Sequence, residues 1–138
     1  MPTTITICRT CRYDRTCDAP VRDGMRFLKR VEDEIAADPD ANGVHLRAMR
    51  CMACCDKACA AQIAADGKMT YVFFGLDAEQ NAADLVAFAR SHERSADGVV
   101  PFGERPEAIK KKIGTRIAPL TDAAPAVETT WDDHDENA

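Results

Sequence analysis

The sequence has no long hydrophobic run. No stretch approaches the roughly 20 apolar residues that a membrane helix needs, and the first residues, MPTTITIC, have neither the basic nor the apolar segment of a signal peptide. We therefore expect a cytoplasmic protein without membrane association, in a compartment that keeps thiols reduced. The seven cysteines are an odd number, which a fully paired disulfide framework would not leave. A disulfide-stapled scaffold is thus the weakest explanation for these cysteines.

Several motifs of catalysis and nucleotide binding are missing as well. The chain has no Gly-rich phosphate loop, no Walker motif and no Ser-His-Asp candidate. The basic run Lys110–Lys112 has no aromatic stacking platform beside it, so nucleic-acid binding is not predicted. His45, His92 and His134 are each expected to be solvated rather than to bind a metal. These absences favour a binding or carrier protein over an enzyme.

Acidic residues are concentrated at the C-terminal end. The net charge is −5, but residues 118–138 contain six acids and no Lys or Arg; without these six, 17 acidic residues stand against 18 basic ones. This stretch has no apolar period and is typical of disorder. We expect one domain over 1–117 and an acidic disordered tail over 118–138. Trp131 is expected to pack loosely on the domain surface rather than to anchor a partner.

Apolar periodicity predicts the elements of this domain. Alternating residues indicate strands, and spacing of three or four indicates helices. Asp66-Gly67 is typical of a tight hairpin turn, and Pro106 of the first residue of a helix. In chain order we expect a strand (4–8), a helix (24–37), a strand (44–49), a cysteine loop (51–59), a hairpin (60–75), a helix (78–94) and a last short helix (107–114).

Each of the two long helices has an apolar stripe that should face the sheet. The stripes consist of Met25, Leu28, Val31 and Ile35 in the first helix, and of Ala82, Leu85, Val86 and Ala89 in the second.

The element order predicts an α/β protein with the thioredoxin-like arrangement, βαβ followed by ββα, with an extra C-terminal helix. Helices are expected on both faces of the central sheet. A right-handed crossover makes the first two strands parallel, and Cys8 and Cys51 follow their carboxyl ends. Because α/β sheets place their sites at that edge, the two cysteine patches, CRTCRYDRTC and RCMACCDKAC, should come together in space.

These patches offer two kinds of metal site. Cys8-x2-Cys11 and Cys51-x3-Cys55 supply the four thiolates that a [2Fe–2S] cluster requires. The pair Cys51-x2-Cys54 with Cys8-x2-Cys11 would suit tetrahedral zinc, although the 39 intervening residues exceed the usual zinc-ribbon spacing. Flanking positive charge would favour thiolates in either case. The arginines in question are Arg9, Arg12, Arg15, Arg47 and Arg50.

Other assignments of the cysteines remain open. Cys17, Cys54 and Cys59 exceed the needs of a four-ligand site and could serve only in packing. Cys8-Arg-Thr-Cys11 also lies where a thioredoxin keeps its CxxC, so a thiol–disulfide oxidoreductase is a further hypothesis. It does not explain why a second cysteine patch should face this one.

The motifs ITICRTCR, RCMACCDKAC, GKMTYVFFGL and SADGVVPFGERPEAIKKKIGTRIAPL, in this order, resemble the DUF1636 family of predicted metal-binding proteins. The resemblance covers Ile5 to about Leu120. Its members are similar to thioredoxin-like [2Fe–2S] ferredoxins, and their genes often lie near genes of cobalamin and cobalt handling.

The resemblance implies metal ligation by Cys8, Cys11, Cys51 and Cys55, with Cys17 as a substitute for Cys11 and Cys59 as a further match to the family pattern. It does not favour Cys54 as a ligand. The expected function is that of a [2Fe–2S] electron carrier with a redox protein as partner. A link of this carrier to cobalamin or cobalt metabolism is part of the same expectation. The alternatives are a zinc- or cobalt-handling protein and a CxxC oxidoreductase; a monomer and a homodimer are both compatible with the sequence.

Overall fold

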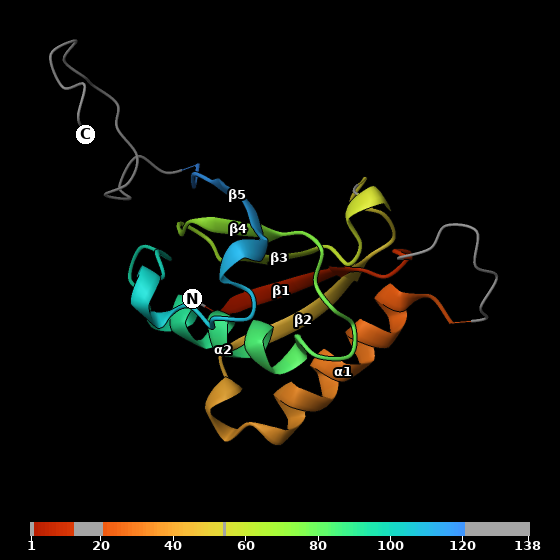
Figure 1. Cartoon of the computed structure of the whole chain (residues 1–138). Coiled ribbons are helices and arrows are strands. Elements are labelled where there is room, and N and C mark those ends of the chain that lie inside the picture. Colours follow the sequence, from red (N-terminus) through yellow and green to blue (C-terminus); the bar gives the residue numbers. More distant parts are fainter. Residues whose placement is uncertain (1, 13–20, 54, 121–138) are drawn as a thin grey trace, which may run out of the picture.

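The computed structural model describes residues 2–12, 21–53 and 55–120. These residues form one five-stranded sheet and two long helices (Figure 1). Short 3-10 turns complete the described part. In chain order the strands and helices are β1 (Thr3–Cys8), α1 (Asp23–Ala37), β2 (Val44–Met49), β3 (Ala61–Ala64), β4 (Thr70–Phe73), α2 (Ala82–Arg94) and β5 (Ile113–Ile117).

The sheet has the strand order β2-β1-β3-β4-β5. β1 and β2 are parallel, with Cys8 opposite Met49, and all other neighbours are antiparallel. Gly67 closes the β3–β4 hairpin with a φ of 73°, the left-handed conformation that glycine adopts without strain. The predicted thioredoxin-like order of βαβ and ββα units is confirmed.

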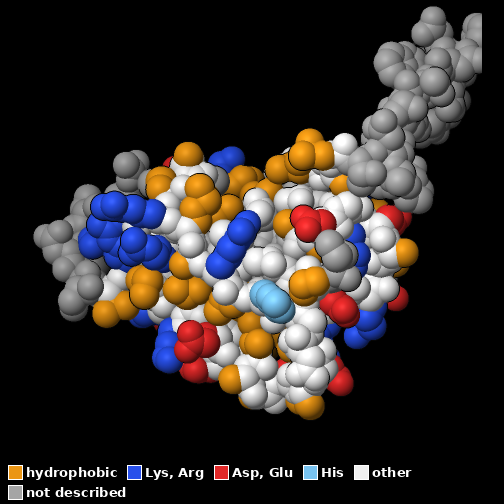
Figure 2. Space-filling model, turned by 180° about the vertical axis from the view of Figure 1, so that it is seen from behind, with side chains coloured by type: hydrophobic (Ala, Val, Ile, Leu, Met, Phe, Trp, Pro, Cys, Tyr) orange, Lys and Arg blue, Asp and Glu red, His pale blue; other side chains and the backbone are white. Residues whose placement is uncertain are grey.

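Both helices pack on the same face of the sheet (Figure 1), so the expectation of helices on both faces is wrong. The reason lies in the strand alternation. Ile5, Ile7 and Ile63 point to one face and are fully buried there, whereas Thr4 and Gln62 point to the other and are partly exposed. Only one face is apolar enough to hold helices, and the view from behind shows the face without them (Figure 2).

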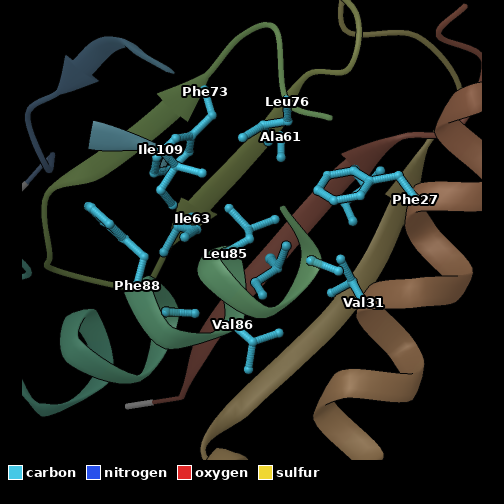
Figure 3. Packing of buried hydrophobic residues seen from close by; sticks show 14 of the residues in the cluster. Phe27, Val31, Ala61, Ile63, Phe73, Leu76, Leu85, Val86, Phe88 and Ile109 are labelled. Carbon is cyan, nitrogen blue, oxygen red and sulfur yellow. The ribbon is translucent and has the colours of Figure 1, made fainter. Parts of the chain in front are cut away.

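The core lies between that apolar face and the two helices. Phe27 and Val31 of α1 meet Leu85 and Val86 of α2 over the strands (Figure 3). The predicted stripe of α2 is confirmed, since all four of its residues are buried. The stripe of α1 is shifted, because Phe27 is buried while Met25 is 40% exposed.

The helix expected over 107–114 does not form. Lys110–Lys112 makes a 3-10 turn, and Ile113–Ile117 continues as β5, an edge strand paired with β4. Gly114 is a poor helix former, and its missing side chain leaves room for the Phe74 ring, which a Cβ would meet at 1.9 Å. Ile109 is buried as expected.

The start of α2 also differs from the prediction, which placed it at residue 78. The Asp77 carboxylate accepts hydrogen bonds from the backbone N–H groups of Glu79 and Gln80 (2.7 and 3.1 Å), forming a turn that delays the helix to Ala82. Neither helix of the described part is long and apolar enough to span a membrane.

Candidate metal centre

The ends of β1 and β2 bring the two cysteine patches together. Both strands run in the same direction, and their last residues, Cys8 and Met49, are partners in the sheet. Beyond the sheet, the backbone N–H of Arg9 donates to the Met49 carbonyl (3.0 Å), and the Thr10 hydroxyl donates to the Arg50 carbonyl. The loop after β1 is therefore tied to the loop that begins with Cys51, as the parallel crossover predicted.

Cys8 and Cys11 form a buried thiol pair at this edge. Each is 1% exposed, and the Cys11 thiol donates a hydrogen bond to the Cys8 sulfur. The Cys8 sulfur also accepts backbone N–H groups from both loops: Thr10 on its own side and Met52 on the β2 side. Two residues that lie 42 positions apart in the chain, Thr10 and Met52, thus contact one sulfur.

These contacts separate the acidities of the two thiols. Burial acts to raise the pKa of Cys8, but the hydrogen bonds from the Cys11 thiol and from the Met52 and Thr10 backbone outweigh burial and lower it. Burial and donation to Cys8 raise the pKa of Cys11 to about 12. Cys8 is therefore the more acidic thiol of the pair, and Cys11 is its hydrogen-bond donor.

The N-terminus of α1 packs against the same pair. The backbone N–H of Gly24 donates to the Cys11 carbonyl (3.0 Å), and a Cβ on Gly24 would lie 2.1 Å from the Cys8 carbonyl oxygen. Only glycine permits this approach of helix and strand end. The positive end of the helix dipole consequently lies beside Cys8, where it favours a thiolate.

Cys59 is a third buried thiol near the pair, with no exposed surface. It stands just before β3, which pairs with β1, and the N–H of Cys8 donates to the Ala60 carbonyl (3.1 Å). The backbone N–H of Ala60 in turn donates to the Cys11 sulfur, and negative charge on Cys59 contributes to the raised pKa of Cys11. The sequence offered Cys59 only as a substitute ligand. Its place before a strand that pairs with β1 is the signal for its proximity.

The second predicted pair is described only in part. Cys51 is exposed, and its sulfur accepts the N–H of Ala53 (3.3 Å). The backbone of Cys55 begins a 3-10 turn, Cys55–Lys57, but its side chain is not among those described. Cys17 and Cys54 lie outside the described residues, so their expected roles stay predictions.

The donor chemistry here suits a thiolate-bound metal, because backbone N–H groups point at the sulfurs of Cys8 and Cys11. The described side chains do not supply a complete set of ligands. Among them, no three of His, Cys, Asp or Glu come close enough together to hold a metal ion. The fit to a four-thiolate group therefore depends on Cys51 and on Cys55, which lies on the loop that follows it.

The two described histidines, His45 and His92, are not part of this edge. His45 is exposed as predicted, and His134 lies outside the described residues. The expectation for His92 is wrong: it is fully buried, with Nε2 donating to the Met69 carbonyl (2.6 Å) and Nδ1 accepting from the Thr3 hydroxyl (2.8 Å). His92 follows Ala89 by three residues and so continues the buried stripe of α2, a spacing that is the sequence signal for its burial.

The flanking arginines divide into two groups. Arg47 turns onto the open sheet face, where its Nε donates to the Thr6 hydroxyl (2.7 Å). Arg9 and Arg50 are exposed beside the thiol pair. Arg15 lies outside the described residues. Positive charge at the site thus comes from the two loops themselves.

The fold is similar to that of a solved iron–sulfur protein. A thioredoxin-like [2Fe–2S] ferredoxin from Aquifex aeolicus superposes with a TM-score of 0.56 over 86% of this chain and 94% of that chain, at 12% sequence identity. This similarity establishes the thioredoxin-like fold. No curated protein matches the sequence.

The sequence motifs themselves identify the relatives of this chain. A family model described as "Protein of unknown function (DUF1636)" matches residues 5–119, which include the thiol pair, both cysteine loops and all five strands but for the first two residues of β1. The chain belongs to the DUF1636 family.

Proposed function

We propose that the thiols at the β1–β2 edge bind a [2Fe–2S] cluster and that the protein carries electrons. Bound there, such a cluster would supply one-electron redox chemistry. The observation that carries the proposal is the Cys8 sulfur, which accepts N–H groups from both cysteine loops. Hydrogen bonds of this kind stabilise metal-bound thiolates and tune their potential. The likeness in fold to a protein named as a [2Fe–2S] ferredoxin supports it.

The proposed ligands are Cys8, Cys11, Cys51 and Cys55. Burial of Cys8 and Cys11 would exclude water from one side of the group, while exposure of Cys51 would leave the other side open to a partner. Cys11, whose pKa is about 12 when it is free, would lose its proton on binding. Cys59 and Cys17 are the substitutes if one of the four does not bind. A role in cobalamin or cobalt metabolism is a further proposal.

The test is an ultraviolet–visible spectrum of anaerobically purified protein, with iron, sulfide and zinc measured on the same sample. We expect red-brown protein that contains equal iron and sulfide and bleaches on reduction by dithionite. Cys51→Ser and Cys55→Ser should each abolish the chromophore, while the matched variant Cys54→Ser should keep it. Loss of colour in the Cys54 variant would contradict the ligand assignment. Colourless protein with stoichiometric zinc would instead support a metal-handling or structural role.

The second candidate is a thiol–disulfide oxidoreductase, favoured by the divided acidities of Cys8 and Cys11. The Cys8 thiolate would attack a substrate disulfide, and Cys11 would then displace the substrate thiol and close a Cys8–Cys11 disulfide. Burial of both sulfurs opposes this role, since a substrate must reach Cys8. Insulin reduction by the metal-free protein, lost in Cys8→Ser but kept in Cys51→Ser, would establish it over the cluster proposal.

A further inference from the structure

An open cavity of about 430 Å³ lies beside the thiol pair. Figure 2 shows Lys and Arg side chains gathered at one end of the face that the helices leave open. The cavity is bordered by the loop after β1, by the start of α1 and by the loop after β2. Its lining residues, named here the arginine pocket, are Arg9, Thr10, Val21, Arg22, Met25 and Arg50.

The charges of the arginine pocket are not neutralised within the described residues. Neither the Arg9 nor the Arg50 guanidinium has a hydrogen bond or ion pair with another described residue, and Arg22 donates one N–H to the Thr10 carbonyl (3.1 Å). No acidic residue lines the cavity. Because guanidinium groups bind carboxylates and phosphates with paired hydrogen bonds, the pocket is suited to an anionic group.

The pocket also exposes apolar surface. Val21 is 51% exposed and Met25 is 40% exposed. An occupant that fits both features needs an apolar side chain next to several carboxylates. The C-terminal tail contains such a segment, Trp131-Asp132-Asp133-His134-Asp135-Glu136. It carries four acidic residues and no Lys or Arg, against three arginines in the pocket.

The length of the tail is sufficient for this contact. Ile117 pairs with Thr70, at the end of the sheet opposite Cys8. Three strand spacings of about 4.8 Å and a six-residue strand of about 20 Å separate this point from the end of β1, a diagonal of about 25 Å. The fourteen steps from Ile117 to Trp131 can span up to about 48 Å when extended. Trp131 can therefore reach Val21 and Met25.

We propose that residues 131–136 of the tail dock into the arginine pocket of the same chain, with Trp131 on the exposed Val21 and Met25 side chains and the carboxylates on the guanidinium groups. Tethering supplies a millimolar effective concentration, so weak contacts suffice. The docked tail neutralises the positive surface beside Cys51 and competes with any acidic partner. High salt releases it, because exposed charges are screened within a few ångströms at about 0.5 M. The docking does not depend on which group the thiols bind.

Trp131 is the one tryptophan in the sequence, so its fluorescence reports on the tail directly. The test compares emission maximum, anisotropy and acrylamide quenching of the full-length protein as purified, at about 20 mM and about 0.5 M NaCl. At low salt we expect blue-shifted emission, raised anisotropy and at least a twofold lower quenching constant than at high salt. The double variant Arg9→Glu/Arg50→Glu should behave at low salt as the wild type does at high salt.

Two further variants make the comparison specific. Arg94→Glu/Lys111→Glu makes the same change of net charge at exposed positions outside the pocket, and it should behave like the wild type. The tail variant Asp132→Asn/Asp133→Asn/Asp135→Asn/Glu136→Gln leaves the folded domain intact and should lose the low-salt signal. This second route keeps the test valid if the arginine variant fails to fold.

Emission typical of free indole at both salt concentrations, in wild type and variants alike, would overturn the proposal and leave the pocket to an acidic partner. A low-salt signal that disappears on dilution would overturn it too, because the tail would then dock on a second copy. An equal loss of signal in the Arg94/Lys111 variant would show that net charge, not the pocket, holds the tail.

Discussion

Substituting Gly24 by alanine tests how closely α1 supports the thiol pair. The added Cβ would lie 2.1 Å from the Cys8 carbonyl oxygen and 3.0 Å from the Arg9 carbonyl carbon. Non-bonded atoms are most stable at about 3.5–4.0 Å, so the start of the helix must move by more than about 1 Å. Both obstructing atoms belong to the backbone of the strand end, so no side-chain rotation relieves the contact.

The expected cost follows from three contributions. Overpacking of a buried site costs about 1–3 kcal/mol. Losing the hydrogen bond from Gly24 N–H to the Cys11 carbonyl costs about 0.5–1.5 kcal/mol more. The better helix propensity of alanine returns up to about 1 kcal/mol. We therefore expect Gly24→Ala to lower the free energy of unfolding by about 1–3 kcal/mol.

The assay is urea unfolding followed by circular dichroism, with metal content measured on the same preparations. Gly103→Ala is the matched control, because a Cβ there meets no atom within 4 Å. It should change the stability by less than about 0.5 kcal/mol. Gly24→Ala should also bind less metal, since the displaced helix no longer holds the Cys8–Cys11 loop. Equal stability and equal metal content in the two variants would refute the role assigned to this contact.

Two buried polar contacts give further predictions. Burial, with Lys68 nearby, keeps the pKa of His92 below its usual 6.5. As the pH falls below about 6.5, the unfolded chain therefore binds a proton at this histidine before the folded protein does, which favours unfolding. The free energy of unfolding should thus be constant above about pH 6.5 and decrease as the pH falls below it, as measured by urea unfolding. His92→Gln should remove this pH dependence while His45→Gln keeps it, and an equal pH dependence in both variants would contradict the prediction. Tyr71→Phe deletes the hydroxyl that accepts the buried Val100 N–H (3.0 Å), and we expect a loss of about 1–3 kcal/mol by the same assay, which unchanged stability would disprove.

The thioredoxin-like order of elements was predictable because each strand alternates and each long helix has a stripe. The alternation of Ile5 and Ile7 with Thr4 and Thr6 also indicates that only one face of the sheet is apolar. Both helices could therefore have been predicted to pack on that face. The mistake at β5 has a different origin. Ile109 and Ile113 fit a helical spacing, whereas pairing with β4 across the sheet decides the conformation, and that contact is remote in sequence.

The sequence was sufficient to predict that the site lies at the carboxyl edge of β1 and β2, but not which contacts its thiols make. Parallel strands ending in Cys8 and shortly before Cys51 place both patches together by topology alone. The acidities of Cys8 and Cys11 depend on the backbone N–H groups of Met52 and Ala60, which any residue type could provide. Because these pKa values depend on backbone groups of a distant loop, the residue types in the sequence do not predict them.

The order in which the thiols leave the ribosome follows from the crossover between β1 and β2. Cys11 emerges 40 residues before Cys51, an interval of roughly 2–8 s at 5–20 residues per second. During that interval the first thiol pair has neither Met52 nor Ala60 beside it. The nascent chain therefore presents an unprotected dithiol to oxidants and stray metal ions, and a complete set of donors exists only after β3 has been made.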